Sequence, residues 1–184
     1  MNIKKLLLIF NLFFVAAAQA FPQAAFSGED QRSAFGRAMD LFNKEKYAPA
    51  IRLFDSYIRD NTDNNSTRAD EAEYYAALSA LRLYNPDAEY RMLVYMARHP
   101  ESPRLNEGRV SLADYVYENK SYRKASAYYE TVNRYELSEE KQAEYYFRYG
   151  YSLYVKGDKA KALTMFSEIK DKDTEYTAPA IYYF

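Results

Sequence analysis

Small and large apolar residues recur at helical spacing through most of the chain. A small residue followed four positions later by a large one occurs at Ala50/Phe54, Ala88/Met92, Ala125/Tyr129 and Ala162/Phe166. Successive pairs lie 38, 37 and 37 residues apart. Residues four apart share one face of an α-helix, so each pair predicts a helix that approaches a neighbour at its small residue and fills the adjacent gap with its large one. The regular spacing indicates a repeated unit.

This unit is clearest between residues 143 and 166. A first helix there presents bulk and one small residue on a single face, at Tyr146, Tyr149, Gly150 and Leu153. Gly157 is expected to end that helix, because glycine readily adopts the left-handed conformation of a helix terminus. A second helix then carries the Ala162/Phe166 pair. The unit is therefore a pair of helices joined by a short turn.

The same reading divides the rest of the chain into helices. The predicted segments are Gln31–Asn43, Tyr47–Asp60, Thr67 to about Tyr84, Asn85-Pro86 to His99-Pro100, Ser102-Pro103 to about Asn119, Tyr122–Tyr135, and a helix that Ser138 caps. Asn85 and Ser102 each precede a proline, which is typical of an N-cap followed by the first helical turn. Residues 61–66 are a polar loop. No segment has the alternation of a strand.

The repeated helix pair resembles the tetratricopeptide repeat (TPR), whose nominal period is about 34 residues. The resemblance covers roughly residues 31–184, with repeats at about 31–66, 67–101, 102–137 and 138–174 and a fifth that begins near residue 178. It implies an all-α fold, a right-handed α-solenoid of TPR-like helix hairpins. In such a fold, stacked helix pairs form a continuous binding surface.

Two joints between helix pairs, Ile58–Ala72 and Met96–Gly108, are similar to those of bacterial envelope repeat proteins. The similarity is to the outer-membrane assembly lipoproteins of BamD type and to the periplasmic cell-division coordinator family. It implies a role in envelope assembly. The chain has no cysteine for lipid attachment, which departs from the BamD type.

Residues 1–20 have the pattern of a signal peptide. Lys4 and Lys5 precede an apolar run from Leu6 to Ala18, and Ala18-Gln19-Ala20 is a small-x-small cleavage signal. The run is shorter than the roughly 20 residues of a membrane-spanning helix. We therefore expect export to the periplasm, cleavage before Phe21, an irregular leader over residues 21–30, and no stable membrane insertion of the mature chain. An uncleaved anchor is the alternative, and a peripheral place at the outer membrane stays open.

The composition is that of a chain that can bury a core, and nothing in it favours nucleic-acid binding. The chain has 184 residues, of which 48% are hydrophobic, and it contains 21 Tyr, 11 Phe and no Cys. We expect most tyrosine rings to pack between helices with their hydroxyls reaching water, and a ligand-binding role is the alternative. The net charge is −1, and acids and bases are interspersed. No basic stripe for phosphates can be traced, so nucleic acid is excluded.

No pattern in the sequence indicates catalysis, a cofactor or a metal. His99 is the single histidine and there is no cysteine, which excludes the usual thiol and zinc sites. His99 precedes Pro100 at a predicted helix end, so its ring is expected to hydrogen-bond to the last carbonyl groups of that helix. Glu71 with Glu73 and Glu139 with Glu140 are read as partners of helix dipoles. We expect a protein that is not an enzyme.

The resulting hypothesis is an exported periplasmic TPR scaffold that binds a protein or peptide of the cell envelope. Two alternatives stay open: a glycan-binding or polysaccharide-handling module, suggested by the tyrosines, and the non-catalytic N-terminal part of a larger envelope enzyme or complex. The apolar stretch Ala180–Phe184 leads us to expect a longer repeat array. The resemblance places the partner on first helices, at Phe35, Met39, Phe42, Tyr117, Phe147, Tyr151 and Tyr154.

Overall fold

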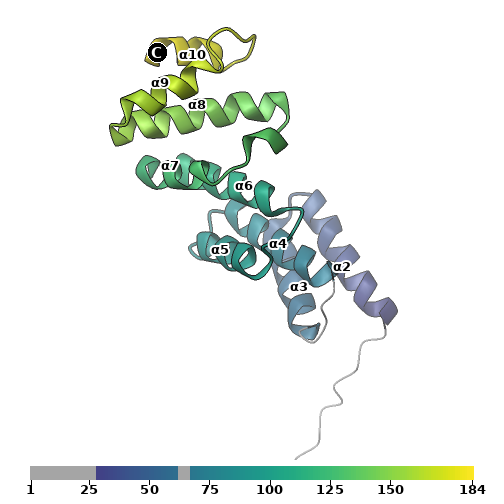
Figure 1. Cartoon of the computed structure of the whole chain (residues 1–184). Helices are drawn as coiled ribbons and strands as arrows, with labels where there is room; N and C mark the ends of the chain where they lie inside the picture. Colours follow the sequence, from purple (N-terminus) through teal and green to yellow (C-terminus); the bar gives the residue numbers. More distant parts are fainter. Residues whose placement is uncertain (1–27, 62–66) are drawn as a thin grey trace, which may run out of the picture. The chain divides into compact units, whose positions relative to one another are not determined.

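The computed structural model describes residues 28–61 and 67–184, and in that part every regular element is helical. The predicted all-α class is therefore confirmed. The elements in Figure 1 are α2 (Gly28–Asn43), α3 (Tyr47–Asp60), α4 (Thr67–Arg82), α5 (Ala88–Arg98), α6 (Leu105–Glu118), α7 (Tyr122–Glu130), the 3-10 helix η1 (Arg134–Glu136), α8 (Glu139–Lys156), α9 (Lys159–Ser167) and α10 (Thr177–Tyr183).

The chain divides into two units, Met1–Gln31 and Arg32–Phe184. In the first unit the described residues are the opening turn of α2. The predicted signal peptide and most of the predicted leader, residues 21–27, lie outside the described residues. The packing that follows concerns the second unit.

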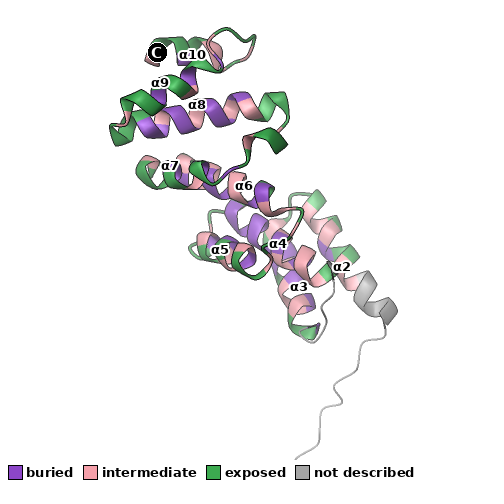
Figure 2. Cartoon of the chain, in the orientation of Figure 1, coloured by how far each residue is buried: buried purple, intermediate pink, exposed green. Residues whose placement is uncertain are grey.

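Each helix from α3 to α9 packs against the helix that follows it in the chain. Alternate helices also meet, because α4 contacts α6 and α6 contacts α8. The rings of α2 join this packing: Phe35 contacts Phe54 of α3, and Phe42 contacts Tyr75 of α4. Figure 2 shows that buried and exposed residues alternate along the helices, as expected for helices with one apolar face. We call α2, α4, α6, α8 and α10 the first helices and α3, α5, α7 and α9 the second helices.

The small and large residues of the repeated pattern form the core at each helix crossing. All eight are at most 2% exposed: Ala50, Phe54, Ala88, Met92, Ala125, Tyr129, Ala162 and Phe166. Burying a phenylalanine or methionine side chain stabilises a fold by about 1.5–3 kcal/mol. The expected burial of these pairs is confirmed, and the recurring pattern is thus a packing pattern.

Several helix ends agree with the sequence. The bounds of α3 are those predicted. The Ser138 hydroxyl accepts a hydrogen bond from the Lys141 amide, which caps α8. At the other end of that helix Gly157 has φ of 97°, a conformation that glycine adopts without steric cost. The Asp158 carboxylate then accepts from the Lys161 amide and caps α9.

Three helix starts differ from the prediction. α2 begins at Gly28, so residues 28–30 of the expected irregular leader are helical. Asn85 does not cap α5, which begins at Ala88 after a turn in which the Ala88 amide donates to the Asn85 carbonyl. α6 begins at Leu105 with Arg104 at the N-cap position. Both prolines therefore lie in turns ahead of the helices, and not in their first turns.

The helix predicted over Tyr122–Tyr135 is also shorter than expected. α7 ends at Glu130, and η1 follows at Arg134. The cause is a pair of hydrogen bonds between Asn106 and the Asn133 backbone, one to its carbonyl and one from its amide, at 2.9 and 2.8 Å. Because Asn133 uses its backbone groups in this way, they are not available to continue α7.

The prediction for the His99 ring was wrong. The His99 ring does not serve the end of α5; its Nε2 lies 3.0 Å from Glu73 of α4, and its backbone amide caps the helix instead.

The expected packing of tyrosine rings between helices is confirmed for Tyr74, Tyr95 and Tyr129, and some tyrosine hydroxyls bond to protein groups. Tyr95 pairs with Ser102 at 2.6 Å, and the hydroxyl of Tyr129 donates to Asp114 at 2.6 Å. These bonds satisfy polar groups that packing removes from solvent.

The turn between the two helices of each pair contains one residue in the left-handed conformation. These residues are Glu45, Tyr84, Lys120 and Gly157, with φ of 57°, 54°, 59° and 97°. For residues other than glycine this conformation costs roughly 1–2 kcal/mol. Tyr84 is the one aromatic residue among the four.

Successive second helices are joined by ion pairs, which we call the second-helix links. Arg91 of α5 lies 2.8 Å from Asp55 of α3. Lys124 of α7 lies 2.6 Å from Glu89 of α5. Lys161 of α9 lies 3.3 Å from Glu130 of α7. One such link therefore connects each second helix to the next.

None of the helices in the described ranges, 28–61 and 67–184, has both the length and the apolar character needed to cross a membrane.

Candidate functional site

A groove of about 430 Å³ lies over three first helices, α4, α6 and α8. Its lining combines an apolar part, two tyrosines and six charged residues. The residues are Leu78, Leu81, Arg82, Tyr84, Val110, Ser111, Asp114, Tyr115, Glu118, Lys141, Glu144 and Arg148. Because three helix pairs contribute to it, the groove depends on how these helix pairs pack together.

Arg148 of α8 is the centre of the charged part of the groove. Its guanidinium lies 3.1 Å from Asp114, 3.3 Å from Glu118 and 2.7 Å from Glu144. Lys141 adds a second cation 2.6 Å from Glu144. The Arg148 side chain is only 17% exposed, and ion pairs that are shielded from water interact more strongly than surface pairs. We call these five residues the charge network.

Two members of the charge network have shifted pKa values. Burial raises the pKa of Asp114, although the Arg148 charge and the hydrogen bond from Tyr129 act in the opposite direction. Burial would lower the pKa of Arg148, but the nearby carboxylates, Asp114 first, raise it. Partly buried titratable groups with shifted pKa values in a cleft are typical of functional sites. The network therefore marks this groove as the candidate site.

Two tyrosines line the groove beside the charge network. The Tyr84 and Tyr115 rings have centroids 5.6 Å apart. The Tyr84 hydroxyl donates to Glu118 at 2.5 Å, and this bond is the main reason that the pKa of Tyr84 is raised. Glu118 is thus linked both to the aromatic rings and to Arg148. We call Tyr84, Tyr115 and Glu118 the aromatic corner.

The partner-binding residues predicted on the first repeat lie apart from this groove. Phe35, Met39 and Phe42 of α2 are partly buried and pack against the core that α2, α3 and α4 share. Phe35 contacts the rings of Phe54 and Tyr57. Their bulk is therefore used in helix packing.

The other predicted residues form a second aromatic group, around α8. Tyr151 contacts Tyr117 of α6 and Tyr183 of α10. Phe147 is partly buried against Phe166 and Tyr176. Burial raises the pKa of Tyr117 to about 12. The structure thus brings Tyr117, Phe147 and Tyr151 together.

Tyr154 has the most open position of the seven predicted residues. It is 41% exposed, and its ring packs at one side on Tyr183. The structure does not join the α2 residues and the α8 residues into one patch. Among the seven, Tyr154 therefore offers the largest exposed fraction to a partner.

Sequence reasoning missed the residues of the charge network. A signal was present, because Asp114 follows Leu112-Ala113 and Arg148 stands between Phe147 and Tyr149, within runs that pack in the core. A charge in such a run must be paired to be tolerated. The sequence did not reveal which charges meet, since Asp114 lies on α6 and Arg148 on α8.

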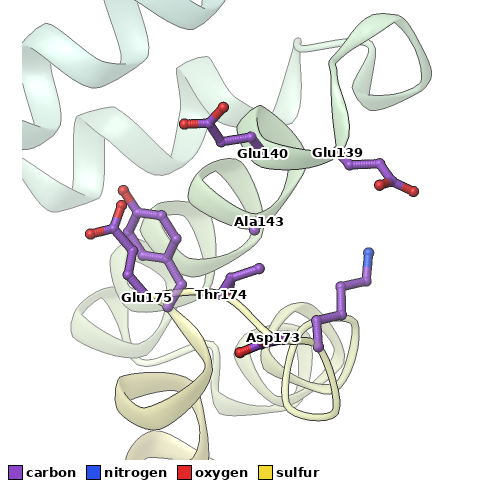
Figure 3. Close-up of a pocket in the computed structure, with 8 residues that line it drawn as sticks. Glu139, Glu140, Ala143, Asp173, Thr174 and Glu175 are labelled. Carbon is purple, nitrogen blue, oxygen red and sulfur yellow. The ribbon is translucent and has the colours of Figure 1, made fainter.

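A larger hollow of about 660 Å³ lies between the start of α8 and the segment before α10. Figure 3 shows Glu139, Glu140 and Ala143 on α8, and Asp173, Thr174 and Glu175 on the opposite side. Lys172 and Tyr176 complete its lining. Its acidic side chains come from a helix start and a loop and are mostly exposed. The groove over α4, α6 and α8 is better defined because Arg148, Asp114 and Glu144 are paired and largely shielded from solvent.

Within residues 28–61 and 67–184, no group of three or more His, Asp or Glu side chains has the arrangement of a metal site.

Comparison with known proteins did not identify a family. No protein-family model matches the chain, and no curated protein matches it.

Proposed function

We propose that the chain is an exported, TPR-like α-solenoid that binds a protein or peptide of the cell envelope through its first helices. The main support for this proposal is that the two helices of each pair cross in the same way. The same small-to-large pair is buried in each of four helix pairs. First helices also contact one another, α4 with α6 and α6 with α8. Repeats stacked in this way form continuous surfaces suited to extended partners.

The groove supports binding by these first helices. It spans three of them and combines apolar, aromatic and charged groups, the mixture found in recognition sites. The alternative glycan-binding module finds less support, because many tyrosines are used in packing, including Tyr74, Tyr95 and Tyr129, which are at most 1% exposed. We assign the protein no catalytic step. An envelope-assembly scaffold in the periplasm is the role that we propose.

The test is capture of partners from envelope extract by the immobilised protein, followed by affinity measurements with each purified partner. Tyr154→Ala removes an exposed ring at the end of α8. Tyr90→Ala on α5, which is 71% exposed, is the matched control on a second helix. We expect Tyr154→Ala to weaken binding by about 1–2 kcal/mol, the range of an interface anchor, and Tyr90→Ala to have little effect.

Circular dichroism should show equal helix content in both variants. A partner whose affinity depends on Tyr90 and not on Tyr154 would place binding on the second helices and contradict the proposal. Absence of any saturable protein partner would contradict the function itself.

A further inference from the structure

Tyr84 occupies a backbone conformation that is unfavourable for a large side chain. Its φ is 54°, and the matching turns carry Glu45, Lys120 and Gly157. Because the same conformation recurs in each of these turns, it belongs to the turn that joins the two helices of a pair. In this position the Tyr84 ring lies against Tyr115 and lines the groove, with 52% of the residue exposed. The turn therefore presents an aromatic surface to the groove.

Glu118 is fixed in place although much of it is open to solvent. One carboxylate oxygen accepts from the Tyr84 hydroxyl at 2.5 Å, and the other lies 3.3 Å from an Arg148 nitrogen. The side chain is nevertheless 44% exposed. A carboxylate that is already oriented loses little conformational entropy when it binds a cation. The aromatic corner is thus preorganised.

Within the charge network there is one more carboxylate than there are cations, and Arg82 is the third cation of the groove lining. The charge network holds three carboxylates, on Asp114, Glu118 and Glu144, against the two cations Arg148 and Lys141. Arg148 already contacts all three carboxylates, so it is poorly placed to receive an anion. Arg82 is the further cation of the lining, and it is exposed at the rim. A basic side chain of a ligand would compete with Arg82 for this position.

We propose that the aromatic corner binds the arginine or lysine side chain of a partner peptide. The cation would lie over the Tyr84 and Tyr115 rings, where the ring faces attract positive charge, and beside the Glu118 carboxylate. Its aliphatic stem would lie along the apolar part of the groove, which includes Leu78 and Leu81. This inference rests on the proposed protein-binding function and specifies the chemistry of the partner.

The experiment compares short Gly/Ser peptides of equal length that carry Arg, Lys, Glu or Gln at the same positions. Binding of each labelled peptide to the full chain is measured by fluorescence anisotropy at low and at physiological salt. We expect the Arg and Lys peptides to bind about tenfold more tightly than the Gln peptide at low salt. The difference should shrink as salt screens the charges.

Variants test whether the preference for Arg and Lys peptides comes from the aromatic corner. Glu118→Gln keeps the shape of the side chain and should bring the Arg and Gln peptides to within about twofold of each other. Glu101→Gln removes an exposed acid in the turn before α6 and should leave the preference unchanged. Arg82→Ala removes the competing cation and should tighten binding of the Arg peptide while weakening that of the Glu peptide. Circular dichroism checks that each variant is folded.

Two results would overturn the inference. Tighter binding of the Glu peptide, lost in Arg82→Ala, would make the groove an anion site. Equal binding of all four peptides would make the aromatic corner a purely structural link between α4 and α6. In the second case a partner whose capture still depends on Tyr154 would leave the protein-binding function intact, whereas loss of all partner binding would remove both proposals.

Discussion

Gly150 lies where α8 and α9 come closest. A Cβ atom added there would be 2.8 Å from Cε1 of the buried Phe166 ring and 3.1 Å from Cβ of Met165. By contrast, a Cβ added at Gly36 of α2 meets no atom within 4 Å. The two glycines therefore form a matched comparison. Gly150 allows α9 to approach α8 closely, whereas Gly36 has free space around it.

The two glycines should respond oppositely to alanine. Gly36→Ala should raise the free energy of unfolding by about 0.5–1 kcal/mol, because alanine favours a helix more than glycine does. Gly150→Ala should lower it by about 1–3 kcal/mol through overpacking against Phe166. Urea unfolding followed by circular dichroism measures both. Stabilisation by both substitutions would show that α9 can move away from α8 at little cost.

The small residues of the second helices allow a related prediction. Ala125 is fully buried and Ala162 is 2% exposed, so Ala125→Leu and Ala162→Leu should each destabilise the fold by about 1–3 kcal/mol. The exposed Lys159→Ala should change stability by no more than roughly 0.5 kcal/mol. Equal urea midpoints for the leucine variants and for Lys159→Ala would contradict the assigned helix register.

Among the helices, the link between α5 and α7 should depend on pH. Burial alone would raise the pKa of Glu89, but hydrogen bonds from Lys124 and Tyr128, together with the Lys124 charge, lower it below the usual 4.5. A carboxyl whose pKa is lowered by folding contributes stability above its unfolded-state pKa and loses it as the pH falls through the folded-state pKa. The ionised Glu89 therefore stabilises the fold near neutral pH.

The corresponding measurement compares wild type with Glu89→Gln across this range. At pH 7 the variant should be less stable, and the difference should shrink as the pH falls below 4.5, the usual glutamate value. Lys161 and Glu130 form an exposed link of the same type, so Glu130→Gln is a control with a smaller expected effect. A difference that stays constant from pH 7 to below that value would contradict the assignment.

Helices as elements were predictable from the sequence, whereas several of their ends were not. The bounds of α3 and the Gly157 terminus of α8 follow from local residues alone. The end of α7 depends on Asn106, which is distant in sequence and bonds to the Asn133 backbone. Local propensity cannot detect such a partner, since it comes from another helix pair.

For the molecule as a whole, the proposed export can be tested at the N-terminus of the mature chain. If the segment ending in Ala18-Gln19-Ala20 is removed, the mature protein should begin at Phe21. N-terminal sequencing of protein recovered from the periplasmic fraction tests this. Recovery of chains that begin at Met1 from the membrane fraction would favour the uncleaved anchor.

The candidate site was less predictable than the fold. The sequence indicated that first helices carry large residues, but it could not separate rings used in packing, such as Tyr117 and Tyr151, from an exposed ring such as Tyr154. It also gave no reason to join Asp114 of α6 to Arg148 of α8. Both distinctions depend on how neighbouring helix pairs stack, which is a property of the assembled unit.

The second-helix links have a mechanical consequence. Each is a contact between charged groups that remain partly exposed, so salt weakens all of them together; the screening length falls from about 10 Å at 0.1 M to about 3 Å at 1 M. The apolar crossings do not share this sensitivity. We therefore expect high salt to weaken the connections between successive second helices, while the apolar crossings keep each helix pair packed.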